Sequence, residues 1–212
     1  MAAGIITKLE PQKNNNKRYS VFVDGDFLLG IDANLVIEYQ LQVGEEISEE
    51  LIEKLLAEED LQQAKDAAFN LLSYRQRSRQ ELKNRLADKG FSPGIIRQVI
   101  NVLDQLDYID DREFAVSWIR DRISRGFGPY RVRQQLREKG IAEQIIEEQL
   151  EAEYDFELEY ELAEELARKK KGRYRNKSDW EARNKLKQVL KRKGFSFSVI
   201  EVVLEDVLSE ED

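Results

Sequence analysis

The feature that most restricts the fold of this sequence is a Lys-Gly dipeptide that returns at a nearly constant interval. Lys89-Gly90, Lys139-Gly140 and Lys193-Gly194 lie 50 and 54 residues apart. Apolar residues match when the dipeptides are aligned, and repeats of this length are supersecondary units that bury their apolar faces against one another. The sequence therefore predicts three related units beyond residue 60. The matching sets are Leu82, Val132 and Leu186; Leu86, Leu136 and Leu190; Phe91, Ile141 and Phe195; Ile96, Ile146 and Ile200; and Ile100, Leu150 and Leu204.

Each unit also carries signals that begin and end helices. Ser78 with Glu81, and Ser178 with Glu181, have the spacing of a capping box, which satisfies amides of the first turn. Gly128-Pro129 takes this place in the middle unit, where proline suits the first helical position. Each Lys-Gly dipeptide then ends that helix, because glycine adopts the left-handed C′ conformation and lysine favours the negative end of the dipole. Ser92-Pro93 begins the next helix of the first unit.

A helix ahead of each capping site completes the unit. We expect these helices at Leu61 to Tyr74, Asp111 to Ser124, and about Phe156 to Lys170, which gives three units of three helices. One unit of this size buries little apolar surface alone, so stability has to come from stacking. We therefore expect three tandem three-helix repeats that form an elongated, curved body.

The start of the chain has a β pattern. Ile5 to Glu10, Arg18 to Val23 and Asp26 to Ile31 contain β-branched or aromatic residues, and Asp24-Gly25 is a strong signal for a two-residue hairpin. We expect a small sheet of about three strands. From Asp32 through Tyr39 the pattern becomes helical.

A second helix of the N-terminal region is expected after Ser48, which can cap it. Leu51, Ile52, Leu55 and Leu56 then lie on one face. The predicted chain is thus mainly α, with a small β-containing N-terminal domain followed by three helical repeats. The predicted domains are residues 1–58, 59–108, 109–154 and 155–212.

The chain contains neither cysteine nor histidine. It therefore lacks the side chains most used as thiol nucleophile, general base and tetrahedral metal ligand near neutral pH. Asp24 and Asp26 flank a turn glycine, and Asp110-Asp111 lies where a helix needs a cap, so backbone roles explain both acidic pairs. We predict no enzyme activity, no catalytic residue, no cofactor and no metal site.

The sequence also indicates a compartment. Without cysteine, nothing ties the protein to an oxidising environment. No secretion-signal pattern is present at the N-terminus, and no uncharged apolar run approaches the roughly 20 residues that span a bilayer. We expect a cytoplasmic protein that has no membrane partner.

Charge occurs in blocks, although the net charge is −8. Residues 141–167 contain 11 acids and no base, whereas residues 168–194 contain 13 bases and 2 acids. Such alternation suggests steering toward a partner that presents both signs of charge. The alternative is that some blocks only complement helix dipoles.

Particular stretches of the sequence resemble the RecX regulatory family. They are Ile119-Arg120-Asp121-Arg122 and Arg125 to Tyr130, which runs on into Leu136 to Ile141. Leu106 to Ala115 is similar to that family's junction between its first and second repeats. The resemblance covers residues 60–208 well, and the first 60 residues more loosely match the β-containing extension of longer members.

The resemblance implies a protein that lies in the helical groove of the RecA–DNA filament. There it would oppose filament growth, ATP hydrolysis, strand exchange and SOS co-protease activity. Some members also bind DNA directly, so single- or double-stranded DNA is a second expected partner. We expect a monomer whose several repeats engage more than one RecA subunit, so that avidity favours the filament over free RecA.

The densest group of basic residues, named here the third-repeat cluster, joins two helices of the third repeat. Its cations can contact DNA phosphates or an acidic RecA surface. The alternative is that they complete a helix with a glutamate-rich start, although dipole complementation acts only over the last turn and needs fewer charges. The members are Arg168, Lys169, Lys170, Lys171, Arg173, Arg175 and Lys177.

A second group, named the arginine cluster, lies near one junction of the repeat unit, where stacking could align it into a stripe. Arginine suits bidentate recognition of phosphate or carboxylate. Solvated surface, or ion pairing with Asp121 and nearby acids, is an equally weighted alternative. The members are Arg75, Arg77, Arg79, Arg120, Arg122, Arg125, Arg131 and Arg133.

Aromatic residues divide into two groups. Tyr74, Tyr130 and Tyr174 each neighbour an arginine and could stack on bases, which leaves their role open. Apolar helix faces predict a core position for the other group. These core candidates are Phe114, Trp118 and Trp180.

The sequence is compatible with three classes of function. The first is a RecA-binding modulator, in which the acidic segment Glu143 to Glu165 either meets basic RecA loops or is solvated helix surface. The second is an autonomous DNA-binding helical module that uses the same arginines. The third and most remote is a carboxylate-dependent nuclease.

Overall fold

The computed structural model describes residues 3–13 and 15–209, so parts of the first and last predicted domains lie outside the described residues. The chain divides into two compact units. One comprises Met1–Arg75 and Lys83–Gln105, and the other comprises Gln76–Leu82 and Leu106–Asp212. The division passes through helix α3 (Arg79–Asp88), and each unit is described by itself.

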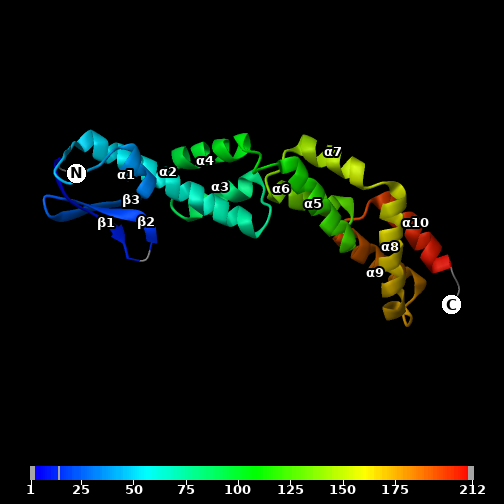
Figure 1. Ribbon diagram of the computed structural model, residues 1–212. Coiled ribbons are helices and arrows are strands. Elements are labelled where there is room, and N and C mark those ends of the chain that lie inside the picture. Colours follow the sequence, from blue (N-terminus) through cyan, green and yellow to red (C-terminus); the bar gives the residue numbers. More distant parts are fainter. Residues whose placement is uncertain (1–2, 14, 210–212) are drawn as a thin grey trace. The chain divides into compact units, whose positions relative to one another are not determined.

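An antiparallel sheet begins the first unit (Figure 1). The Asp24-Gly25 hairpin is confirmed, because both residues have positive φ, 51° and 92°, as a type I′ turn requires. We expected about three strands, and the described residues form four. The additional strand, β4, was missed because it has only two residues and no alternating pattern. The sheet has the order β3-β2-β1-β4, from β1 (Gly4–Gln12), β2 (Asn15–Val23), β3 (Asp26–Asp32) and β4 (Glu46–Ile47).

Helices α1 (Ala33–Glu38) and α2 (Glu49–Tyr74) follow, and both begin at capping residues, of which Ser48 was predicted. The side chain of Asp32 accepts from the amide of Asn34, and Ser48 Oγ accepts from the amide of Leu51. We expected a break between the helix after Ser48 and the next helix, and this was wrong. No glycine or proline interrupts this stretch, so one helix of 26 residues continues through the predicted boundary at residue 58.

A buried carboxylate fastens α2 to the sheet. Glu59, 3% exposed, accepts a hydrogen bond of 2.7 Å from the amide of Asp32 and pairs with the guanidinium of Arg18 on β2. The apolar side of the sheet packs against α1 and α2 to form the core of this unit. This core consists of Ile6, Val21, Val23, Leu29, Ile31, Leu35, Leu41, Ile47, Ile52 and Leu55.

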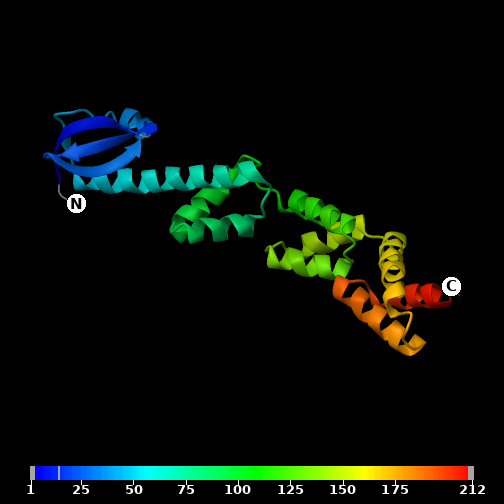
Figure 2. The same ribbon diagram turned by 90° about the horizontal axis from the view of Figure 1, so that it is seen from below.

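Three units of three helices are confirmed (Figures 1 and 2). The first uses the later part of α2 with α3 and α4. The second and third use α5 to α7 and α8 to α10, with a short 3₁₀ turn, η1, after α8. The bounds are α4 (Pro93–Gln105), α5 (Asp111–Ser124), α6 (Pro129–Glu138), α7 (Glu143–Glu153), α8 (Phe156–Lys171), η1 (Gly172–Tyr174), α9 (Asp179–Lys193) and α10 (Phe197–Ser209).

The aligned apolar positions form the repeat cores, as predicted. All of them are buried except Phe91, which is half-buried. Phe114 is buried and Trp118 packs against the core of the second repeat, so both core assignments are confirmed. The assignment of Trp180 was wrong: it lies in the first turn of α9 and is 75% exposed.

Within the second unit, the middle helices of successive repeats meet end to end at contacts named here helix joints. At the joint between α9 and α6, carbonyls that end α9 accept hydrogen bonds from amides that begin α6. The Gly128 amide donates to the Lys193 carbonyl (2.9 Å), and the Tyr130 amide donates to the Gly194 carbonyl (3.0 Å). Groups that each helix leaves unpaired thus satisfy one another, and the two dipoles align head to tail.

The joint between α6 and α3 follows the same plan. Ser78 Oγ, which caps α3, donates to the carbonyl of Lys139 at 2.7 Å, and the Lys139 ammonium pairs with Glu81. Gly140 has a φ of +73°, and a Cβ placed on it would lie 2.4 Å from Cβ of Gln80. The Lys-Gly dipeptide therefore ends one helix and also leaves room for the start of the next.

Candidate partner-binding surface

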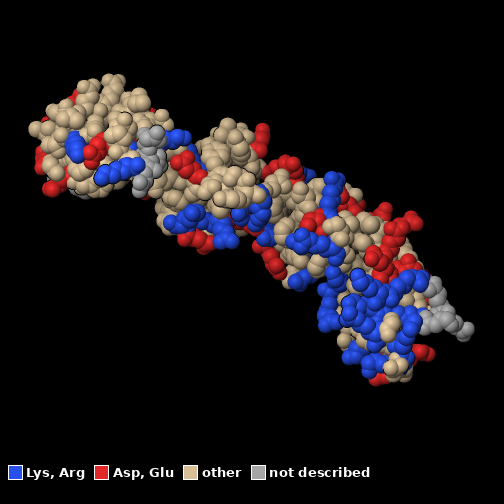
Figure 3. Space-filling model, turned by 60° about the horizontal axis from the view of Figure 1, so that its bottom comes forward, with Lys and Arg blue, Asp and Glu red and all other residues tan. Residues whose placement is uncertain are grey.

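The third-repeat cluster occupies the end of α8, the η1 turn and the segment before α9. Lys and Arg side chains form an extensive basic area over this repeat (Figure 3). The sequence places them there because the glutamate-rich start of α8 is followed by a last turn of Arg168, Lys169, Lys170 and Lys171. These charges suit the negative end of the helix, but they continue beyond it through Arg173 and Arg175.

The members of this cluster differ in whether an acid among the described residues pairs with them. Arg168 pairs with Glu164 one turn earlier, at 2.8 Å. Among the described residues, by contrast, Lys169, Lys170 and Arg173 form no ion pair with an acid. Their uncompensated charge is the strongest feature of this surface, because unpaired cations keep their full attraction for an incoming anion.

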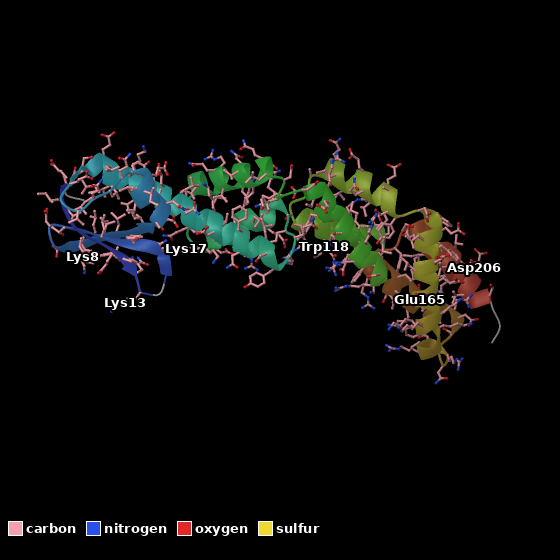
Figure 4. All side chains as sticks on the ribbon, in the orientation of Figure 1. Lys8, Lys13, Lys17, Trp118, Glu165 and Asp206 are labelled. Carbon is pink, nitrogen blue, oxygen red and sulfur yellow. The ribbon has the colours of Figure 1, made fainter. Side chains whose placement is uncertain are left out.

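A cavity of about 430 Å³ opens beside the cluster, between the second and third repeats within the second unit. Lys169, Lys170, Arg125 and Lys193 line it, together with apolar side chains from α5, α8 and α9. One acid, Glu165 of α8, also lines it (Figure 4). Four cations beside one carboxylate make this hollow suitable for an anionic group.

Lys193 shows how crowded the cations are. Burial of its ammonium lowers the pKa of Lys193, and repulsion from Lys170 lowers it further. Its Nζ lies 3.9 Å from the ring centroid of Phe127 and donates to the Arg125 carbonyl at 3.1 Å. We did not predict Lys193 as a site residue, although the repeated Lys-Gly dipeptide could have singled it out.

Most of the arginine cluster in the second repeat is paired with acids. Arg120 makes a bidentate pair with Glu153 (2.9 and 2.7 Å), and Arg133 pairs with Glu147 at 2.6 Å. Arg125 pairs with Asp121, and Arg131 donates to the side chain of Gln134. The acidic face of α7 therefore compensates this cluster inside the protein.

Arg122 lies between two aromatic rings of the second repeat. Its guanidinium lies 4.1 Å from the ring centroid of Trp118 and 6.0 Å from that of Phe127, while its Nε is buried and has no hydrogen-bond partner. Lys139 lies over Trp118 at 4.9 Å. The cations of both helix joints, Lys139 and Lys193, thus join one alternating series of rings and charges.

Comparison with known proteins gives matches to four successive stretches of the chain. Family models described as regulatory protein RecX N-terminal domain and as the first, second and third three-helix domains of RecX match in sequence order. The matched residues are 4–48, 64–103, 110–150 and 157–204. The chain belongs to the RecX family.

Individual RecX proteins are similar over nearly the whole chain. The protein named regulatory protein RecX from Bacillus cytotoxicus is 35% identical, with 98% of this chain and 78% of that one covered. The one from Bacillus subtilis is 31% identical with the same coverage.

Solved RecX structures also match. A crystal structure of regulatory protein RecX has a TM-score of 0.77 and 31% identity over 95% of this chain and 98% of its own. RecX from Lactobacillus salivarius has a TM-score of 0.65 and 34% identity over 70% of this chain and 96% of its own.

The remaining predicted contact residues of this RecX family member are dispersed. The Arg79 amide donates to Asp111 at 2.9 Å, and its guanidinium lies 3.8 Å from the same carboxylate. Tyr74 and Tyr130 are exposed, whereas Tyr174 packs against the core of the third repeat. Arg75 and Arg77 lie just before the capping residue Ser78, and Lys177 just before Ser178.

Members of both acidic pairs accept hydrogen bonds from backbone amides. Asp24 accepts from the amide of Ile5, and Asp110 accepts from the amides of Arg112 and Glu113 at the start of α5. In the described part of the chain, no group of acidic side chains is arranged to hold a metal ion. No helix there is long and apolar enough to cross a membrane.

Proposed function

We propose that this chain binds the RecA–DNA filament and inhibits the recombinase, ATPase and co-protease activities of RecA. Membership of the RecX family supports a regulatory role, since the relatives are named regulatory proteins. The observation that carries the proposal is the third-repeat cluster, in which Lys169, Lys170 and Arg173 have no acidic partner among the described residues.

Energetics favour this cluster as the contact surface over the arginine cluster. A phosphate or carboxylate that approaches Arg120 or Arg133 has to displace Glu153 or Glu147, and little net free energy is gained by the exchange. An anion that approaches Lys169 and Lys170 displaces only water and salt ions. The glutamates of α7 and α8 repel phosphates, so they would also favour one orientation on a nucleoprotein filament.

The proposal describes a cytoplasmic regulator with no catalytic step, cofactor or metal. Dilute protein would be a monomer whose repeats contact more than one RecA subunit. Linked contacts of this kind give the assembled filament a higher affinity than free RecA without any additional contact type. Co-sedimentation with filaments, compared with binding to free RecA, measures this difference.

The direct functional test is the ATPase of RecA on single-stranded DNA. Addition of this protein at a stoichiometric ratio to RecA should lower the steady-state rate severalfold. The same titration at rising salt should shift inhibition to higher protein concentration, because the contacts are electrostatic. An unchanged rate at stoichiometric ratio and low salt contradicts the proposal.

The second candidate function is that of an autonomous DNA-binding module. It is supported by the cationic cavity beside Lys169 and Lys170, which could hold a phosphate group. Phosphate contacts give a linear fall of log affinity with log salt, with a slope near −0.7 per phosphate for single strands. Tight binding to DNA alone at physiological salt would favour this module. Weak binding that needs RecA would favour the filament.

A further inference from the structure

The helix joint between α6 and α3 consists of three contacts, named here the joint contacts. A serine that caps one helix donates to the carbonyl of the lysine that ends the other, as Ser78 does to Lys139. A glutamate three residues after the serine pairs with the same lysine, as Glu81 does. The glycine after the lysine then provides space for the first turn of the capped helix.

The joint between α9 and α6 is a second example. Gly128 stands in the serine position, and backbone amides of Gly128 and Tyr130 donate to the carbonyls of Lys193 and Gly194. A Cβ on Gly194 would lie 2.3 Å from the amide nitrogen of Arg131, so this glycine is also in close contact. An aromatic residue two positions after the cap, Tyr130, is therefore compatible with the joint.

Two helix ends of this kind form no joint with any described residue: the end of α3 at Lys89 and the start of α9 at Ser178. At the end of α3, Lys89 forms no ion pair with a described acid, and a Cβ on Gly90 would meet nothing within 4 Å. Gly90 has the same left-handed backbone as Gly140 and Gly194, with φ of +92°. The end of α3 thus has the geometry of a joint without the helix that occupies the other two.

The start of α9 is the complementary end. Ser178 and Glu181 form a capping box, as Ser78 and Glu81 are spaced to do, and both are exposed. Trp180, 75% exposed, takes the position of Gln80 and Tyr130 in the two joints. The start of α9 therefore carries a serine, an aromatic residue and a glutamate at the positions that make the joint contacts with a Lys-Gly helix end.

We propose that this chain associates head to tail with a second copy of itself, the end of α3 in one copy receiving the start of α9 in the next. Ser178 of one copy donates to the carbonyl of Lys89 in the other, Glu181 pairs with the Lys89 ammonium, and Trp180 covers Gly90. The carbonyl end of α3 meets the amide end of α9, so dipole alignment continues from one molecule to the next. Acidic residues 1–60 and basic residues 168–194 add charge complementarity between copies.

Such an interface is heterologous, and each copy keeps one open end, to which a further copy can add. One joint is much smaller than the roughly 1,200 Å² of a stable complex, which leaves the dilute protein monomeric. The biological role rests on the proposed function: copies bound side by side on a periodic filament have a high effective concentration, and one joint then suffices to make binding cooperative.

Cysteine crosslinking tests the joint directly, because the chain has no cysteine of its own. Asp88→Cys with Asp179→Cys places one thiol beside each open helix end. It leaves unchanged the residues that would make the joint contacts. Glu138→Cys with Arg79→Cys occupies the equivalent positions of the internal joint, and Asp88→Cys with Glu205→Cys is a mismatched control. All three are treated, concentrated and without RecA, with a short bis-maleimide.

The proposal predicts a ladder of dimers and larger species for the first pair, an intrachain link for the second and background for the third. A first pair that gives no more oligomer than the mismatched control, while the internal pair links, overturns the proposal. Because this arm contains no RecA, it decides the inference whether or not the proposed function holds. Added RecA–DNA filaments should raise the ladder yield at low protein concentration only if both hold.

A charge exchange gives the second, independent arm. On the Asp88→Cys, Asp179→Cys background, Lys89→Glu alone and Glu181→Lys alone should each reduce the ladder severalfold, since like charges then face each other. An equimolar mixture restores opposite charges at every joint and should recover it. A mixture that stays as low as its components, when both variants retain the circular dichroism of the parent, contradicts the assigned contact.

Discussion

The glycine that ends a middle helix has to adopt a left-handed backbone conformation, and at a helix joint it also has to leave space for the next helix. Gly194 has a φ of +90°, a region that L side chains rarely adopt, and its backbone is in close contact with Arg131 of α6. Gly90 has the same backbone conformation at the end of α3, but open space around it. The two positions therefore separate the cost of backbone strain from the cost of a steric clash.

Gly194→Ala should lower the free energy of unfolding by roughly 2–5 kcal/mol, from left-handed strain of about 1–2 kcal/mol and forced displacement of the joint of about 1–3 kcal/mol. Gly90→Ala should cost only the strain, about 1–2 kcal/mol. Urea unfolding followed by far-ultraviolet circular dichroism measures both. Equal losses would show that the α9–α6 contact does not require the missing side chain.

Glu201 of α10 predicts a pH dependence. Hydrogen bonds from the Lys187 ammonium and the Arg183 guanidinium lower the pKa of Glu201 below its ordinary value of about 4.5. A carboxyl with a lowered folded-state pKa stabilises the fold above its unfolded pKa, and this contribution disappears as pH falls through the folded value. Stabilisation should thus be complete at neutral pH and lost below about pH 4.5.

Glu201→Gln tests this pH dependence. The urea midpoint of the variant should lie below that of the wild type at pH 7, and the gap should narrow by pH 3. A gap of the same size at both pH values would mean that charge on Glu201 contributes nothing. Glu205→Gln, an exposed acid one turn later on α10, is the matched control.

Residue identity alone predicted some positions and not others. Phe114 was correctly assigned to the core, because its apolar neighbours recur at helical spacing. Trp180 follows the same rule in sequence, yet the first turn of α9 exposes it. The ion pairs of Arg120 with Glu153 and of Arg112 with Glu148 join residues 33 and 36 positions apart, and no local pattern encodes such pairs.

Among the elements, α2 depends on one buried acid. Glu59 is 3% exposed and binds both the Arg18 guanidinium and the Asp32 amide, so it holds the helix against β2 and β3. Glu59→Ala should leave Arg18 without its partner and lower unfolding free energy by about 3 kcal/mol or more. Urea unfolding measures the change, with the exposed Asp60→Ala as control; similar losses for both would contradict this role.

The elements themselves were largely readable because helix signals are local. Capping residues, the Lys-Gly dipeptides and apolar spacing predicted the three-helix units, and α5 has the expected bounds, Asp111–Ser124. Strand β4 and the continuity of α2 were missed, because the first depends on pairing with β1 and the second on the absence of any interrupting signal. The joints were missed because they exist only once repeats pack together.

For the whole molecule, charge placement carries the functional argument. The sequence predicted the third-repeat cluster from composition, but it did not show which cations are already paired. Most of the second-repeat arginines form ion pairs with acids of the same repeat, whereas Lys169, Lys170 and Arg173 pair with no acid in the part of the chain that the structure describes. The elongated, curved body expected from the repeats stays a prediction.

A salt titration separates the proposed contact from general electrostatic attraction. Replacement of Lys169, Lys170 and Arg173 by glutamine should reduce the slope of log affinity for single-stranded DNA against log salt by about 2. The slope should stay unchanged when Lys8, Arg85 and Arg97 are replaced, since these lie outside the cluster. A slope equal to that of the wild type in the cluster variant would remove phosphate contact from this surface.

The central claim is that the uncompensated cations of the third repeat engage the RecA–DNA filament. The most direct measurement is inhibition of the RecA ATPase on single-stranded DNA by the variant Lys169→Glu, Lys170→Glu, Arg173→Glu. Its control, Lys8→Glu, Arg85→Glu, Arg97→Glu, changes net charge equally. The account predicts inhibition reduced at least tenfold in potency for the cluster variant and retained in the control; equal potency of the cluster variant and the wild type would contradict it.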